Sequence, residues 1–123
     1  MTFSEMSVLH VEDEVLIAME VSHVLASLGF KQVELAHTLK SAEDIISKQR
    51  FDAAILDVNL GNGERTLSIG RKLRQMGTQV VFASVYNRSE LSEDYQSFEF
   101  LEKPISVLDL TNVLQKLRAR AEN

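Results

Sequence analysis

The sequence predicts an α/β protein with a doubly wound parallel sheet of five strands and helices on both faces. Short apolar runs, typical of buried strands, alternate with stretches in which apolar residues recur every three or four positions, typical of amphipathic helices. Helical crossovers between strands favour a parallel sheet. Glycines stand where two of the helices should end.

The first two strands differ in polarity. Residues 6–11 form an apolar run that ends in three acidic residues, and a helix with one apolar face should follow over about 14–28. Residues 31–36 alternate apolar and polar side chains, which suits a strand at the edge of the sheet. The second helix should begin at Thr38 or Ser41, since either can cap it.

The third strand ends at the most informative position. Residues 53–56 form an uncharged run that stops abruptly at Asp57, the pattern of a strand covered on both faces. Open α/β sheets bind ligands at the carboxyl ends of their strands, so Asp57 is a candidate site residue. Gly61 and Gly63 follow as flexible turn residues, and a third helix should end at Gly77.

The last part of the chain has two short strands and one well-supported helix. The strands should lie at 79–84 and 98–101. Between them, residues 86–96 contain only Leu91 as an apolar residue, so the fourth helix should be short or degenerate. The final helix should begin with a capping box near Ser106.

Length and composition set further limits. The 123 residues suit one domain, 1–123. A net charge of −5 disfavours direct binding to nucleic acid, because nonspecific binding depends on neutralising phosphates. The sequence shows no cysteine, no signal-peptide pattern and no apolar run of membrane length. We therefore expect a cytoplasmic protein that contacts neither nucleic acid nor membrane.

The strand order 2-1-3-4-5 would place the half-polar second strand at the edge and make the first and third strands neighbours. Glu12 and Asp13 would then lie beside Asp57. Ser84 and Lys103 would line the same crevice, because each follows a later strand. Three crowded carboxylates repel one another, and a cation would relieve that repulsion.

The expected cation is Mg²⁺, with Mn²⁺ as the alternative, because the donors are hard oxygens and few come from protein. Its ligands should be the carboxylates of Asp13 and Asp57 and the main-chain carbonyl of Asn59, with Glu12 reaching it through water. The metal and Lys103 could together neutralise the charge that develops in phosphoryl transfer. Asp57 would then be the nucleophile.

Over essentially its whole length the chain resembles the receiver domain of bacterial two-component response regulators. The matching residues are Glu12-Asp13 within VLHVEDE, Asp57 within LDVNLGNG, Ser84, Phe100 and Lys103-Pro104. The resemblance implies a flavodoxin-like fold and a phosphorylation switch. It further implies that Asp57 accepts a phosphoryl group from a phosphohistidine on a sensor kinase or phosphotransfer protein. Ser84 would turn to bond that group, Lys103 would pair with it, and Phe100 would be a switching aromatic.

Two departures accompany this resemblance. Val85 stands where the family usually has Ala or Gly, and the interval from Ser84 to Lys103 is shorter than usual. The stretches VVFASVY and LDVNLGNGE are similar to an alphaproteobacterial stress-associated subgroup that carries a Phe-Ala-Thr-Gly motif. Because the chain ends soon after its final helix, we expect no output domain, signalling by protein contact, and either a monomer or a phosphorylation-promoted dimer.

Two other functions fit parts of the sequence. A small metal-dependent phosphatase of the haloacid dehalogenase type would also use Asp57 as nucleophile, although Asn59 replaces its second aspartate. An interaction module that keeps the fold but needs no phosphorylation is the other alternative. His10, His23 and His37 share no ligand spacing, and we interpret them as structural or surface residues.

Overall fold

The computed structural model describes residues 1–121, which form a five-stranded parallel sheet. The strands lie in the order β2-β1-β3-β4-β5, so the predicted order is confirmed. The strands are Ser7–Val11 (β1), Gln32–Ala36 (β2), Ala53–Asp57 (β3), Gln79–Ser84 (β4) and Glu99–Glu102 (β5). The α-helices are Val15–Ser27 (α1), Leu39–Lys48 (α2), Leu67–Gln75 (α3) and Val107–Ala121 (α4).

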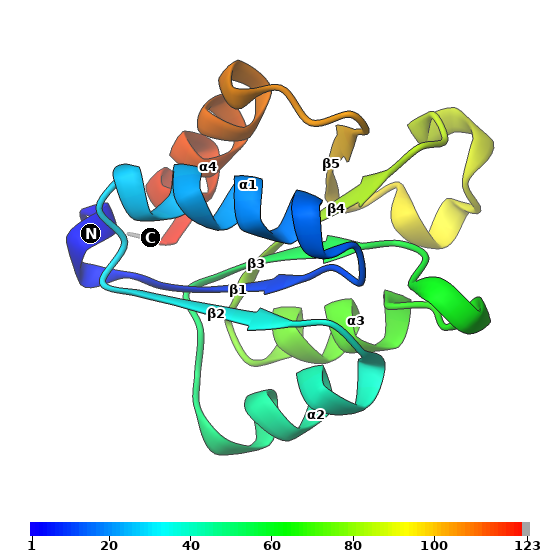
Figure 1. The fold of residues 1–123 in the computed structure, drawn as a ribbon, viewed down its shortest axis with the longest axis horizontal. Coiled ribbons are helices and arrows are strands. Elements are labelled where there is room, and N and C mark those ends of the chain that lie inside the picture. The colour runs from blue at the N-terminus through cyan, green and yellow to red at the C-terminus, as the bar shows by residue number, and fades with distance from the viewer. Residues whose placement is uncertain (122–123) are drawn as a thin grey trace.

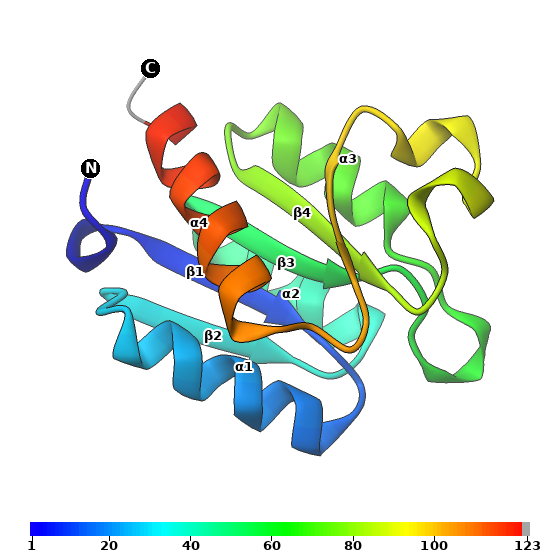
Figure 2. The same ribbon diagram turned by 90° about the horizontal axis from the view of Figure 1, so that it is seen from above.

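The sheet lies between two helical layers. Helices α1 and α4 cover one face, and α2 and α3 cover the other (Figures 1 and 2). Because successive side chains of a strand point to opposite faces, β1 contributes Val8 to the core under α1 and α4 and Leu9 to the core under α2 and α3. Strand β3 is buried along its whole length, as predicted, whereas the edge strand β2 is mostly half-buried. No helix within residues 1–121 is long and apolar enough to cross a lipid bilayer.

Side chains at the helix starts explain where α2 and α4 begin. Thr38 Oγ1 accepts a hydrogen bond from the N–H of Ser41 at 3.0 Å, and Ser41 Oγ accepts one from the N–H of Thr38 at 3.4 Å. Of the two candidate caps, Thr38 is therefore the N-cap of α2. Ser106 Oγ accepts the N–H of Asp109 at 3.0 Å at the start of α4.

The segment between β4 and β5 contains no α-helix, so the prediction of a short or degenerate fourth helix is confirmed. It holds two short 3-10 helices, Arg88–Glu90 (η3) and Glu93–Tyr95 (η4). The Arg88 guanidinium donates to the carbonyls of Gln96 and Phe98, and the Gln96 side-chain amide donates to the Arg88 carbonyl at 2.7 Å. These bonds close the segment into a loop beyond the strand ends (yellow in Figure 1). Strand β5 starts at Glu99, one residue later than predicted.

Tyr95 anchors this loop in the core. Its side chain is buried, and its ring meets the Phe82 ring edge-on, with the ring centroids 5.1 Å apart. Phe98 packs against the same Phe82 ring at 4.9 Å. The tip of the Phe82 ring lies against Gly70 of α3, where a Cβ would collide with the ring. The loop is therefore held by aromatic packing rather than by an amphipathic helix.

Candidate functional site

Four strand ends bring the predicted site residues together. Strands β1, β3, β4 and β5 point in the same direction, and Glu12, Asp57, Ser84 and Lys103 lie at or just beyond their carboxyl ends. These ends are on the right in Figure 1. A crevice of about 280 Å³ opens among them. Its lining includes Asp13, Asp57, Asn59, Ser84, Val85 and Lys103.

Lys103 bridges two of the carboxylates. Its Nζ lies 2.7 Å from Glu12 Oε1 and 2.8 Å from Asp57 Oδ2. All three side chains are at most 10% exposed, so water screens these ion pairs weakly. The main-chain N–H of Lys103 also donates to the Ser84 carbonyl at 2.8 Å, which ties the lysine to the end of β4.

Burial and the ion pairs shift the pKa values of Asp57 and Lys103. Burial raises the pKa of Asp57 to about 7, and the negative charge of Glu12 acts in the same direction against the opposing effect of Lys103. Burial acts to lower the pKa of Lys103, but its hydrogen bonds to Asp57 and Glu12 outweigh burial and leave that pKa raised. Lys103 is therefore a permanent cation at neutral pH. Asp57 becomes fully ionised there only with additional positive charge.

The residues present fit a divalent metal ion. Glu12, Asp13 and Asp57 each offer a carboxylate oxygen, and these oxygens all lie within 4.8 Å of one another. A hard cation that takes oxygen donors matches this set. Glu12 is already bonded to Lys103 and accepts the N–H of Glu14 at 3.2 Å, so its carboxylate is less free than that of Asp13.

The turn after β3 contains a further oxygen donor, the main-chain carbonyl of Asn59. Asn59 and Arg65 form an isolated antiparallel bridge. The hydrogen bonds of this bridge come from the flanking residues, from the N–H of Leu60 to the carbonyl of Glu64 at 2.9 Å and from the N–H of Thr66 to the carbonyl of Val58 at 3.3 Å. Neither of these two bonds uses the Asn59 carbonyl, and Asn59 lines the crevice, which is compatible with the predicted metal ligand.

Two groups near the acidic residues were not predicted. The main-chain N–H of Gly61 donates to Asp13 Oδ2 at 2.8 Å, whereas the sequence suggested only a flexible turn residue. The buried hydroxyl of Thr66 donates to the main-chain carbonyl of Asp57 at 2.6 Å. The position of Thr66 at the start of a predicted helix could have pointed to its hydrogen bond with Asp57. The contact of the Gly61 amide could not be found in this way, because residue types do not show where main-chain N–H groups point.

The family model for the response regulator receiver domain matches residues 8–115. The chain belongs to this family. Receiver domains are signalling switches of two-component systems that bind Mg²⁺ at an acidic pocket, and this receiver domain has such a pocket in Glu12, Asp13 and Asp57.

Solved structures and a curated relative agree with the family. The receiver chain superposes on SdrG from Sphingomonas melonis Fr1 with a TM-score of 0.79 at 30% identity, over 92% of this chain and 96% of that one. It superposes on chemotaxis protein CheY4 of Vibrio cholerae with a TM-score of 0.80 at 26% identity, over 91% and 98%. The transcriptional regulatory protein LytR of Staphylococcus aureus (strain N315) is 24% identical in a 118-residue alignment that covers 93% of this chain and 48% of LytR. The chain thus spans about half the length of the curated relatives it matches.

The two predicted switch residues of the receiver domain occupy different environments. Ser84 is buried, and its Oγ accepts the N–H of Tyr86 at 3.1 Å. Phe100 is half-buried on β5, pairs in register with Phe82, and packs against the core under α2 and α3. Ser84 therefore lines the crevice itself, while Phe100 lies on the neighbouring strand.

The histidines lie outside the receiver's acidic cluster. Nδ1 of the exposed His37 is 2.9 Å from the Glu12 carbonyl, and His23 is exposed on α1. His10 is 1% exposed, its Nδ1 has no hydrogen-bond partner, and burial lowers its pKa to about 3. Within the described residues, the cluster able to hold a metal contains carboxylates only.

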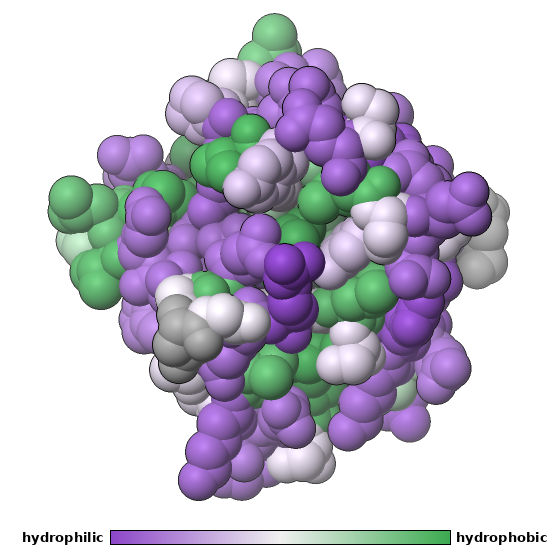
Figure 3. Space-filling model, turned by 90° about the vertical axis from the view of Figure 1, so that its right-hand side faces the viewer, coloured by the Kyte–Doolittle hydropathy of each residue, from purple (hydrophilic) through white to green (hydrophobic). Residues whose placement is uncertain are grey.

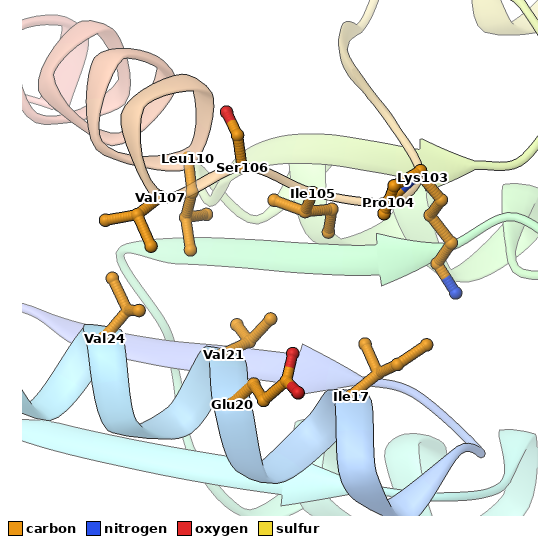
Figure 4. Close-up of a pocket in the computed structure, with 10 residues that line it drawn as sticks. All are labelled: Ile17, Glu20, Val21, Val24, Lys103, Pro104, Ile105, Ser106, Val107 and Leu110. Atoms are coloured by element: carbon orange, nitrogen blue, oxygen red, sulfur yellow. The ribbon is translucent and has the colours of Figure 1, made fainter.

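Exposed apolar side chains lie at the same end of the receiver domain as the crevice. Leu16 and Met19 in the first turns of α1, and Val85 and Tyr86 after β4, are each more than half exposed. Figure 3 shows this end of the molecule, where apolar surface lies among hydrophilic side chains. A cavity of about 120 Å³ also separates α1 from residues 103–110, with Lys103 at one end (Figure 4).

Proposed function

We propose that this receiver domain is a phosphorylation-dependent switch that accepts a phosphoryl group on Asp57 from a phosphohistidine of a sensor kinase or phosphotransfer protein. It would signal by protein contact. The observation that carries the proposal is the buried Asp57 carboxylate, which is bonded to Lys103 and lies within the acidic cluster with Asp13. The similarity of VVFASVY to the stress-associated subgroup remains a prediction about the pathway.

In the proposed transfer, Asp57 uses a carboxylate oxygen to attack phosphorus. The new O–P bond forms as the N–P bond to the donor histidine breaks, and that bond's electron pair stays on the imidazole nitrogen. Lys103 neutralises charge on the transferred group, and the Ser84 hydroxyl donates to one of its oxygens. Asp13, Asp57 and the Asn59 carbonyl would hold Mg²⁺ or Mn²⁺, which supplies further positive charge when bound.

Labelling with acetyl phosphate, followed by intact-mass measurement, tests this function. We expect one added phosphoryl group in the presence of Mg²⁺ or Mn²⁺ and none in excess chelator. A folded wild-type protein that stays unmodified under both conditions would favour the phosphorylation-independent interaction module. Sustained turnover of small phosphate esters would instead favour the haloacid dehalogenase type of phosphatase.

The exposed apolar residues Leu16 and Met19 give a prediction about how the phosphoryl donor protein docks. Leu16 and Met19 lie on the first turns of α1, directly after the acidic residues, so a protein that brings a phosphohistidine to Asp57 would cover them. Leu16→Glu should slow transfer from a phosphorylated kinase or phosphotransfer protein by about tenfold, since it puts a charge into an apolar contact.

Labelling of Leu16→Glu by acetyl phosphate should match wild type, because that small donor needs no docking surface. Ala26→Glu, an exposed position at the far end of the same helix, is the matched control and should transfer normally. An equal loss with both donors would show that the substitution damages the site rather than a docking surface.

The 86–96 segment should become more protected from hydrogen exchange on phosphorylation. Ser84 Oγ accepts the N–H of Tyr86, and the same hydroxyl can donate its hydrogen to a phosphoryl group on Asp57, which would connect that group through Ser84 to the start of the segment and hold the segment in one conformation. Hydrogen exchange should be compared with and without beryllofluoride, with α2 as the internal reference. Equal protection of the segment in both states would contradict this prediction.

A further inference from the structure

The turn after β3 contacts the acidic loop after β1. Asp13 Oδ2 accepts the main-chain N–H of Gly61 at 2.8 Å, a bond between residues 48 positions apart in the sequence. Gly61 begins a single 3-10 turn, Gly61–Gly63 (η2). A hydrogen bond to a carboxylate is charge-assisted and stronger than a neutral one. The bond occupies one oxygen of Asp13 and leaves the other free.

Asp13 has no other strong partner among residues 1–121. Lys103 forms its ion pairs with Glu12 and Asp57, and no ion pair of the described residues involves Asp13. Two carboxylates lie within a few ångströms of Asp13, and like charges at that range repel. Without the Gly61 amide, repulsion would favour rotation of the Asp13 side chain out of the crevice.

The amide is held in place by a closed turn. The N–H of Leu60 donates to the carbonyl of Glu64 at 2.9 Å, and the Asn59–Arg65 bridge closes the base of the turn. Gly63 has a φ of 84°, a left-handed conformation that glycine adopts without strain. The turn that presents the Asn59 carbonyl therefore also fixes the direction of the Gly61 N–H.

A side chain at position 61 would displace the Asp13 carboxylate. A Cβ built on Gly61 would lie 2.8 Å from Asp13 Oδ2, so the flexible end of the Asp13 side chain would have to move away. At Gly63 a Cβ would meet nothing within 4 Å, so that glycine serves the backbone conformation alone. Glycine thus leaves room for the Asp13 carboxylate at position 61 and permits the left-handed backbone at position 63.

We infer that the main-chain amide of Gly61 is a positioning group that holds Asp13 beside Asp57 and so strengthens divalent-metal binding. This inference rests on the proposed function. A carboxylate that is already oriented loses less conformational freedom when it binds a cation, and the affinity rises accordingly. A competing effect also exists, because an amide bonded to the carboxylate withdraws negative charge from it. The sign of the measured change decides between the two.

The Mg²⁺ affinity of a Gly61→Ala variant shows whether the Gly61 amide strengthens or weakens metal binding. Mg²⁺ titration by calorimetry should show binding weakened by about tenfold, because the alanine Cβ would push the Asp13 carboxylate away from the main-chain amide and break a hydrogen bond to a charged group. Gly63→Asn is the matched control in the same turn, because asparagine tolerates a left-handed backbone, and it should bind Mg²⁺ like wild type. Unchanged or tighter binding by Gly61→Ala would overturn the inference.

Two further readouts separate positioning from general damage. In an Asp13→Ala background, adding Gly61→Ala should leave the residual Mn²⁺ affinity unchanged, because no carboxylate remains to be displaced, whereas a further loss would indicate a merely structural role. In the metal-free wild type, the Gly61 amide proton should resonate downfield and move upfield in Asp13→Ala. If the wild type shows the downfield Gly61 amide but binds no Mg²⁺, the proposed function is contradicted. If the wild type binds Mg²⁺ tightly but its Gly61 amide is not shifted downfield, only the inference about Gly61 is contradicted.

Discussion

Asp57→Asn should abolish phosphoryl uptake while the protein stays folded. The substitution replaces a carboxylate that is bonded to Lys103, belongs to the metal cluster and, unlike Glu12, lines the crevice, and a carboxamide is not a nucleophile at phosphorus. The side chains are nearly equal in size, so the crevice keeps its shape. Intact-mass measurement after acetyl phosphate and Mg²⁺ should show no added phosphoryl group.

The same variant should be more stable than wild type in the absence of metal. The pKa of Asp57 is raised from 3.8 to about 7, so its contribution to stability is complete below pH 3.8 and is lost as the pH rises through 7. At pH 8 the wild type thus carries an unfavourable buried charge that asparagine lacks. The Glu12–Lys103 pair remains in the variant. Urea unfolding in chelator at pH 8 should show a gain of about 2 kcal/mol.

Asp52→Asn is the control for both measurements. Asp52 precedes the same strand at its opposite end, where its Oδ2 accepts the N–H of Ser7 at 2.9 Å. This variant should label like wild type and gain no stability. Phosphoryl uptake by Asp57→Asn would identify a different acceptor and contradict the proposed function.

The carboxylates and the lysine of the site could be predicted because it was enough to know where each strand ends in the sequence. Asp13, Asp57 and Lys103 each follow an apolar run, and parallel strands bring such positions to one edge of the sheet. The Gly61 amide could not be predicted in this way, because its contact depends on the exact path of a closed turn. Sequence patterns report the order of side chains and not the direction of main-chain N–H groups.

The burial of Tyr95 is a second feature that could not be predicted from the sequence. Leu91 is the one aliphatic residue of the 86–96 segment, so the sequence predicts only a short or degenerate helix there and does not single out Tyr95 as a core residue. In the structure the Tyr95 ring is buried against Phe82, and the fourth helix is replaced by short turns. An aromatic side chain with a polar tip fits either environment, so its burial is decided by tertiary packing.

His10→Leu should remove a large part of the acid sensitivity of folding. Burial lowers the pKa of His10 from 6.5 to about 3, and Lys103 and His37, the charged and titratable groups that act on it, lower it further. Between pH 6.5 and 3 the unfolded chain therefore binds a proton that the folded chain does not. The contribution of His10 is complete above pH 6.5 and declines as the pH falls, by about 3 kcal/mol between pH 7 and pH 4.

Urea unfolding of wild type and His10→Leu in chelator, from pH 4 to pH 7, measures this effect. Asp57 titrates in the same range with the opposite sign, but it is present in both proteins and cancels in the difference. The advantage of the leucine variant should grow as the pH falls and should persist at pH 7, because the unpartnered Nδ1 of His10 is removed as well. His23→Leu, which changes an exposed histidine, should show no such trend. A pH-independent difference for His10→Leu would mean that His10 is protonated in the folded protein, which requires an acceptor for its Nδ1 and a more open core beneath α1 and α4.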